Sequence, residues 1–133
     1  MTRINKINML NIKGDLQTES DIKLMVDSFY DKVNQDDILS YVFNDFAQVN
    51  WETHLPKMYN FWNKVLFAKG DYKGNPFQKH IPLPVKKEHF DRWIALFEEN
   101  MDEHFSGEMA EDAKLRAKSI AHIFHSKLSF MHS

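Results

Sequence analysis

Apolar side chains recur at intervals of three and four residues along four long segments, and this periodicity limits the fold more than any other feature. The segments run from about residue 20 to 34, 50 to 67, 86 to 105 and 108 to 131. Such spacing places apolar side chains on one face of an α-helix. The chain holds only four glycines and four prolines, and no segment alternates in the manner of a strand. The sequence therefore predicts an all-α protein.

The organisation along the chain predicts a single domain over residues 1–133. Residues 1–17 are expected to form a loosely packed lead-in. A short helical turn is expected from about residue 37 to 42, ending in Phe43. The stretch from Ala68 to Pro76 contains two glycines and a proline and should interrupt the helices. No repeat or interdomain linker is visible in the sequence.

Composition excludes several classes of protein. The chain has no cysteine, so disulfides, iron–sulfur clusters and thiolate zinc sites are ruled out. The formal net charge is -2, and cations are spread among anions, which argues against nucleic acid as a partner. The first residues lack a continuous apolar run, so neither a membrane span nor a signal peptide is predicted. The cytoplasm is the expected location.

Aromatic residues are abundant, at 14% of the chain with eleven Phe and three Trp. One interpretation is a core built from large side chains. The other is a pocket lined for a flat apolar ligand.

Four polar side chains lie where they could meet in an aromatic interior. Tyr30, His54 and Trp93 fall on the apolar faces of their helices. A buried tyrosine or tryptophan needs a hydrogen-bonding partner, whereas a lone histidine on such a face is more often a satisfied core residue. His80 is followed by two prolines that restrict its backbone.

The remaining five histidines, at positions 89, 104, 122, 125 and 132, fit surface or capping roles better. His122 and His125 are three residues apart and could ligate a metal in principle. The apolar stripe of their helix points His122 elsewhere, so a solvated pair is the favoured interpretation.

Several short stretches, in their order and spacing, resemble the truncated haemoglobins of the third group. These stretches are FYDKV at residues 29–33, VF at 42–43, HLPKMYNFW at 54–62, KHIPLP at 79–84 and HFDRWIALF at 89–97. The most specific element is a histidine followed by Pro-x-Pro and, thirteen residues after the histidine, a tryptophan. The likeness covers most of the chain, from about Ile22 to Leu128.

The resemblance implies a shortened globin fold, with helices packed two over two around haem b. It implies that His80 is the proximal iron ligand and that Tyr30, His54 and Trp93 are the polar residues of the distal pocket. It further implies haem contacts from a set of mostly apolar side chains, namely Phe29, Phe43, Met58, Trp62, Lys79, Leu83 and Phe90. Among them, Lys79 is expected near a haem propionate.

The expected function is binding of O2 or another diatomic gas, held by strong distal hydrogen bonds. Strong retention favours detoxification of NO or peroxide, with a reductase as partner, over bulk O2 transport. Two alternatives stay open: a ligand sensor or store that acts through a partner, and a helical domain without haem whose aromatics form only a core. His54 is expected either to gate the pocket or to ligate iron itself. A monomer or weak dimer is expected.

Overall fold

The computed structural model describes residues 13–70, 72, 74 and 85–132. Within these residues the chain is helical and contains no strand. Its elements in chain order are α2 (Glu19–Gln35), α3 (Asp37–Ser40), the π-helical turn η1 (Tyr41–Phe46), α4 (Trp51–Phe67), α6 (Lys87–His104) and α7 (Glu108–His132).

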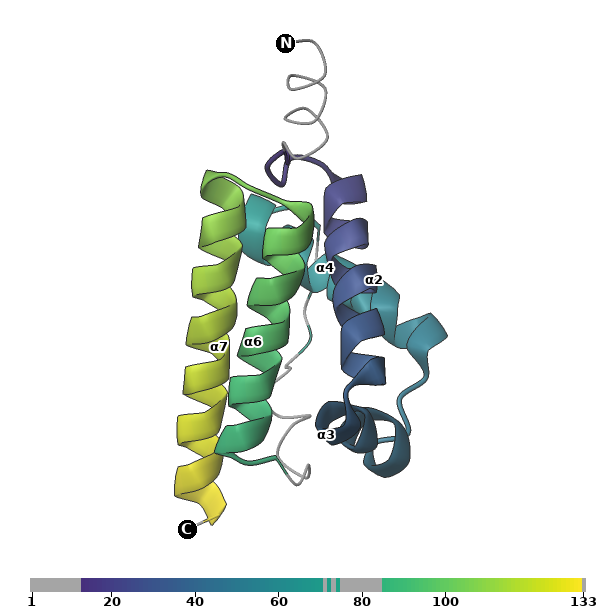
Figure 1. The fold of residues 1–133 in the computed structure, drawn as a ribbon, viewed down its shortest axis with the longest axis vertical. Helices are drawn as coiled ribbons and strands as arrows, with labels where there is room; N and C mark the ends of the chain where they lie inside the picture. The colour runs from purple at the N-terminus through teal and green to yellow at the C-terminus, as the bar shows by residue number, and fades with distance from the viewer. Residues whose placement is uncertain (1–12, 71, 73, 75–84, 133) are drawn as a thin grey trace, which may run out of the picture.

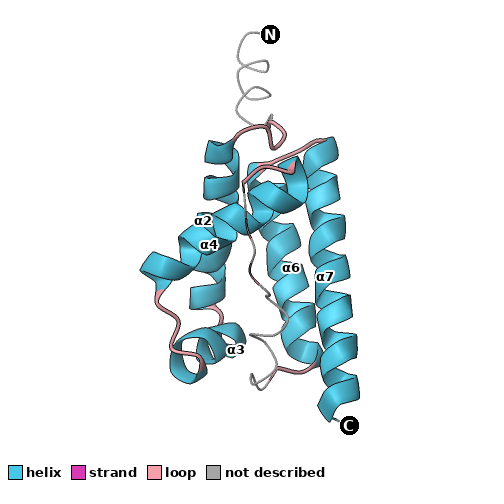
Figure 2. Cartoon of the chain, turned by 180° about the vertical axis from the view of Figure 1, so that it is seen from behind, coloured by secondary structure: helices cyan, strands magenta, loops and turns pink. Residues whose placement is uncertain are grey.

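The four long helices form two layers. α6 and α7 lie side by side and run in opposite directions, joined by a short turn (Figure 1). α4 crosses α2 obliquely to make the second layer, and α2 also packs on α6. Seen from behind, α4 passes across the front of α2, and α3 with η1 lies at the far end of α2 from residue 19 (Figure 2). The arrangement leaves the α2–α4 layer facing the α6–α7 layer.

The helices begin where the sequence supplies side-chain caps. Thr18 accepts from the N–H of Asp21, whose carboxylate accepts in return from the Thr18 N–H, so α2 starts with a capping box. Asn50 accepts from the N–H of Glu52 and starts α4. At α6 the imidazole of His89 reaches back, and its Nδ1 accepts from the Lys86 N–H at 2.9 Å. The four long helices predicted from the sequence are confirmed. Each observed helix end lies within two residues of the predicted end.

The core is centred on Phe97 of α6, which is almost fully buried. Phe29 of α2 meets its ring edge-on at 5.2 Å between centroids, while Trp62 of α4 stacks on it at 5.3 Å. Trp93, one turn earlier on α6, also stacks on Phe97, at 5.7 Å. Such aromatic pairs add directional preference to the burial of large apolar area. The two layers are therefore joined by rings of fixed orientation.

The segment after α2 differs from the predicted short helix over residues 37–42. α3 ends at Ser40, and the chain continues through a six-residue π-helical turn, Tyr41–Phe46. Phe43 lies inside this turn instead of following a helix. In a π-turn the backbone hydrogen bonds join residues five apart instead of four, and the spacing of apolar residues does not reveal this change.

At the described end of the loose lead-in expected over residues 1–17, Leu16 is buried and Asp15 is half-buried, while Lys13, Gly14 and Gln17 are exposed. Leu16 is only 1% exposed. The Asp15 carboxylate accepts from the N–H groups of Met109 and Ala110, at 2.9 and 2.7 Å, and so caps the first turn of α7. Gly107 permits this approach, because its φ is +144° and an added Cβ would lie 2.5 Å from the Asp15 Cγ. Residues 1–12 lie outside the described part of the chain.

Candidate functional site

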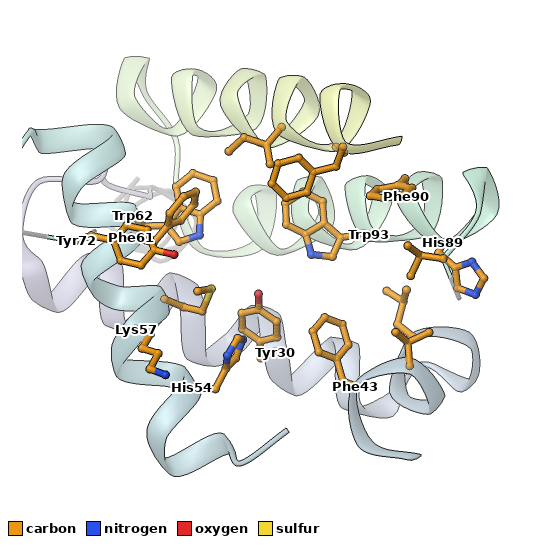
Figure 3. Close-up of a pocket in the computed structure, with 17 residues that line it drawn as sticks. Tyr30, Phe43, His54, Lys57, Phe61, Trp62, Tyr72, His89, Phe90 and Trp93 are labelled. Atoms are coloured by element: carbon orange, nitrogen blue, oxygen red, sulfur yellow. The ribbon is translucent and has the colours of Figure 1, made fainter. Parts of the chain in front are cut away.

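A pocket opens between the two layers, and seventeen described residues line it (Figure 3). Fifteen of them come from α2, α3, η1 and α4 on one side and from α6 and α7 on the other, while Tyr72 and Val85 lie between α4 and α6 in the chain. The lining is mainly aromatic and aliphatic: Tyr30, Leu39, Val42, Phe43, His54, Lys57, Met58, Phe61, Trp62, Tyr72, Val85, His89, Phe90, Trp93, Ile120, Ala121 and Phe124.

Tyr30 projects its hydroxyl from α2 towards the α6 side of the pocket, where the indole of Trp93 faces it (Figure 3). The Trp93 N–H donates to the Tyr30 hydroxyl oxygen. Burial raises the pKa of Tyr30 well above its ordinary value of 10, and the hydrogen bond from Trp93 opposes part of that rise. Tyr30 therefore keeps its proton near neutral pH. Because its oxygen already accepts from Trp93, the O–H remains available to donate to a third group.

His54 lies in the first turns of α4 beside Tyr30. Their rings meet edge-on at 5.8 Å, and the ring of Trp51 meets His54 edge-on at 5.5 Å. Trp51 is itself fixed, since its indole N–H donates to the Asn44 side chain at 2.8 Å. His54 is half-buried, and Lys57 one turn further along α4 is exposed. This side of the pocket therefore meets solvent.

The rings of Tyr30 and Trp93 pack against core residues on the side away from the pocket. Phe29 contacts Tyr30 at 4.9 Å and Trp93 at 5.4 Å, both edge-on. Phe97 stacks on Trp93 at 5.7 Å. Tyr30 and Trp93 are thus held in place by packing as well as by their mutual hydrogen bond, which limits the rotation of both side chains.

These helices and this pocket have counterparts among known proteins. A family model for bacterial-like globins matches residues 14–127. The chain belongs to the bacterial-like globin family. The globin is 38% identical over 117 residues to the group 3 truncated hemoglobin ctb of Campylobacter jejuni, a match that covers 85% of this chain and 91% of that protein.

Solved structures agree with this assignment. The crystal structure of the group III truncated hemoglobin from Campylobacter jejuni superposes on the globin with a TM-score of 0.80 and 34% identity, covering 88% and 95% of the two chains. The truncated oxygen-avid haemoglobin from Bacillus subtilis matches with a TM-score of 0.69 over 80% and 92% of the chains; at 21% identity it supports the fold alone. The predicted third-group truncated globin fold is confirmed. As a family member, the globin binds haem and a gaseous ligand.

The structure brings together most of the predicted site residues that it describes. Tyr30, His54 and Trp93 all line the pocket. So do the expected apolar contacts Phe43, Met58, Trp62 and Phe90. Phe29 does not line the pocket: it is 2% exposed and lies in the core behind Tyr30 and Trp93, unlike the haem contact expected for it. His80, Lys79 and Leu83 lie outside the described residues.

The other histidines take varied positions. His89 is among the residues that line the pocket, but its imidazole turns away from the pocket centre to cap α6 (Figure 3). His122 is exposed, and His125 packs against Phe90 at 5.6 Å. Within the described residues, no cluster of three or more His, Asp or Glu side chains could hold a metal ion.

Sequence reasoning missed several lining residues. Phe61 and Lys57 share α4 with His54, and their helical spacing could have indicated them. Tyr72 was missed because it sits in a stretch of glycine and polar residues. Its ring meets Phe61 edge-on at 5.4 Å, and burial raises its pKa. A Cβ added to Gly74 would lie 2.4 Å from the Tyr72 hydroxyl, so glycine at that position leaves room for the ring.

The side chains that line the pocket fit haem, which is a flat, largely apolar ring with acidic substituents. Aromatic side chains face each other across the space between the layers. The hydrogen-bond donors at its centre, Tyr30 and Trp93, come from opposite layers and meet on one side. Lys57 is the only Lys or Arg among the described lining residues.

None of the described helices is long and apolar enough to cross a membrane.

Proposed function

We propose that this globin retains O2 or another diatomic gas through strong hydrogen bonding, and that it serves detoxification of NO or peroxide more than bulk O2 transport. The observation that supports the proposal is the Tyr30 hydroxyl. It is buried, keeps its proton, accepts from Trp93 and faces the pocket.

When bound, haem supplies the iron at which a diatomic gas is held and made electron-rich. The chain supplies the donor. Because Trp93 fixes the Tyr30 oxygen, the Tyr30 O–H has a defined direction in which to donate. A hydrogen bond to a charged acceptor contributes about 1.5–3 kcal/mol, which corresponds to roughly ten- to a hundredfold slower release of the gas. A carrier needs easier release, so this chemistry favours retention and reaction.

We also propose that His80 would hold the iron of haem b, and that Lys79 and Leu83 would be further haem contacts. Covalent c-type attachment needs cysteines, and the chain has none. Lys57 is exposed and lines the pocket, so it would be available to pair with a haem propionate. Haem retention tests the axial assignment: His80→Ala should lose haem, while His89→Ala should keep it. Equal retention by both variants would overturn the role of His80.

For His54 we propose gating of the pocket, since the residue is half-buried between Tyr30 and the exposed Lys57. The alternative is that His54 itself would bind the iron when no gas is bound. An optical spectrum of the deoxygenated ferrous protein separates the two. A five-coordinate spectrum supports gating, and a six-coordinate spectrum that His54→Leu abolishes supports ligation.

The detoxification proposal requires a redox partner, because NO and O2 combine to nitrate only with one added electron. We propose a separate reductase as its source. Stopped-flow mixing of NO with the O2-saturated ferrous protein should give nitrate within one fast phase. Continued nitrate formation should then depend on a reductase and NADH. A single slow phase, with no turnover when a reductase is added, would identify a passive binder.

A further inference from the structure

One buried carboxylate joins three helical elements at the edge of the pocket. Asp36 follows α2 directly, and its Oδ2 accepts from the N–H of Leu39, which caps α3. Its Oδ1 accepts from the Nε of Arg92 on α6 at 2.5 Å. The Asp36 side chain is only 7% exposed, whereas that of Arg92 is 48% exposed. The two residues are 56 positions apart in the sequence, so the contact exists only in the folded chain.

The carboxylate is charged in this setting. Burial by itself would raise the pKa of Asp36, but the Leu39 N–H and the Arg92 guanidinium together hold that pKa below its ordinary value. A charged group this deeply buried is destabilising unless its partners stay in place. Buried ion pairs add little stability compared with apolar contacts of the same size, and their better-supported use is to fix one geometry.

The pair spans two walls of the pocket. Leu39, which Asp36 caps, lines the pocket, and so does Phe43 in the turn that follows. On the other wall, Arg92 directly precedes Trp93, the donor to Tyr30. The contact therefore ties the segment that carries Phe43 to the turn of α6 that carries Trp93.

The α3–η1 segment depends on such contacts for its position. α3 has only four residues, too few for a helix to be stable by itself. The turn η1 is held on its outer side by exposed hydrogen bonds from Asn44 to Asn34 and from Trp51 to Asn44. Trp93, in contrast, is packed firmly between Phe29 and Phe97. Loss of the Asp36–Arg92 contact would thus release the Phe43 side of the pocket more than the core.

We propose that Asp36 and Arg92 are positioning residues that fix the separation between the α3–η1 wall and the Trp93 wall of the pocket. Their effect on gas release rests on the proposed distal role of Tyr30 and Trp93. Their effect on the geometry around Trp93 does not rest on that role.

The experiment uses the full chain loaded with haem, ferrous and saturated with CO, which is diamagnetic. The variants are Asp36→Asn, which keeps a side-chain oxygen to cap Leu39, and Arg92→Gln. Arg92→Lys retains the charge and tests for partial rescue. Lys87→Gln is the matched control, because it breaks the exposed Lys87–Asp91 pair on the same helix. The chain has three tryptophans, and Trp93→Phe identifies the indole N–H signal of Trp93 in the NMR spectrum.

We expect Asp36→Asn and Arg92→Gln to shift the Trp93 indole signal and to speed hydrogen exchange at the backbone N–H groups of Val42 and Phe43 by about threefold to tenfold. Arg92→Lys should fall between them and the wild type, and Lys87→Gln should match the wild type. Equal signals and exchange rates in all five proteins would overturn the positioning role. The role would also be overturned if Arg92→Lys, in a fully folded protein, changed the Trp93 signal and the exchange rates as much as Arg92→Gln does. In that comparison the signals of the other two indoles should match those of the wild type.

Gas release then separates this inference from the proposed function. If the role of Tyr30 holds, Asp36→Asn and Arg92→Gln should both speed release of O2, and the double variant should add little to either one. If Tyr30→Phe leaves release unchanged, the proposed function fails. The NMR comparison still decides whether Asp36 and Arg92 position the two walls.

Discussion

The two walls of the pocket use different chemistry. On the α2–α4 side, Tyr30, His54 and Lys57 offer a hydroxyl, an imidazole and an ammonium group. The α6–α7 side is mainly apolar and is made by Phe90, Trp93, Ile120, Ala121 and Phe124. Among the described lining residues of that side, Trp93 is directed at Tyr30 and the imidazole of His89 is used to cap α6. Apolar side chains also line the α2–α4 side, but most of the polar groups lie there, so substitutions of polar and of apolar side chains should separate gas retention from haem retention.

The largest expected effect concerns the polar wall. Tyr30→Phe removes the donor while keeping the ring, so O2 should dissociate about ten- to a hundredfold faster. Stopped-flow displacement of O2 by CO measures this rate. Tyr59→Phe is the matched control, because Tyr59 also lies between α2 and α4 but donates to Asp27 outside the pocket. If O2 dissociated at similar rates from the two variants, the Tyr30 hydroxyl would not be a donor that retains O2.

A smaller effect is expected on the apolar wall. Phe124→Ala removes a half-buried ring that lines the pocket from α7, so haem should dissociate about tenfold faster. O2 release should change by less than about threefold, since Tyr30 and Trp93 are untouched. Transfer of haem to an excess of an apoglobin acceptor measures the first rate. The control is Phe130→Ala on the same helix, at a side chain that is 84% exposed. A change in O2 release larger than this would show that the two sides of the pocket do not control gas retention and haem retention separately.

The smallest effect is expected outside both walls. Asp15→Ala removes the cap on α7 and should lower the free energy of unfolding by about 1–2 kcal/mol, with haem and O2 dissociation unchanged. Urea unfolding of the haem-loaded protein measures this. Asp112→Ala, which breaks an exposed pair with Arg116 on the same helix, should cost less than about 0.5 kcal/mol.

The stability that Asp15 contributes should also depend on pH. Burial alone would raise the pKa of Asp15, but the N–H groups of Met109, Ala110 and Leu16 together hold it below its ordinary value of 3.8. The folded state therefore favours the charged carboxylate, and its contribution is complete above that ordinary value. As the pH falls below it, the wild type and Asp15→Ala should converge in stability. A difference that stays constant down to the lowered pKa would contradict this.

Helix positions and the identity of the central polar residues were predictable, because both follow from local rules. Apolar spacing placed Tyr30, His54 and Trp93 on inward faces, and the structure gathers them in one pocket. The π-turn that holds Phe43 was not predictable, since its apolar residues fit an ordinary helix equally well. The position of Phe29 was missed for a similar reason: a residue beside Tyr30 can face the pocket or the core, and only packing against Phe97 decides.

Long-range contacts could not be predicted from the sequence. The cap that Asp15 provides to Met109 spans 94 residues and the Asp36–Arg92 pair spans 56, and nothing in the local sequence pairs these residues. The lining by Tyr72 depends on where the stretch after α4 lies relative to Phe61. The proximal role of His80 and the cytoplasmic location stay predictions.

The Asp15 cap has a consequence for the order in which the molecule is made. α7 comes last among the described helices, yet its first turn takes its cap from residue 15. The same helix closes the pocket through Ile120, Ala121 and Phe124. A nascent chain whose α7 is still inside the ribosome would present α2, α4 and α6 with one side of the pocket open. Stable capture of haem should therefore await release of the last helix, when residue 15 and the start of α7 can meet.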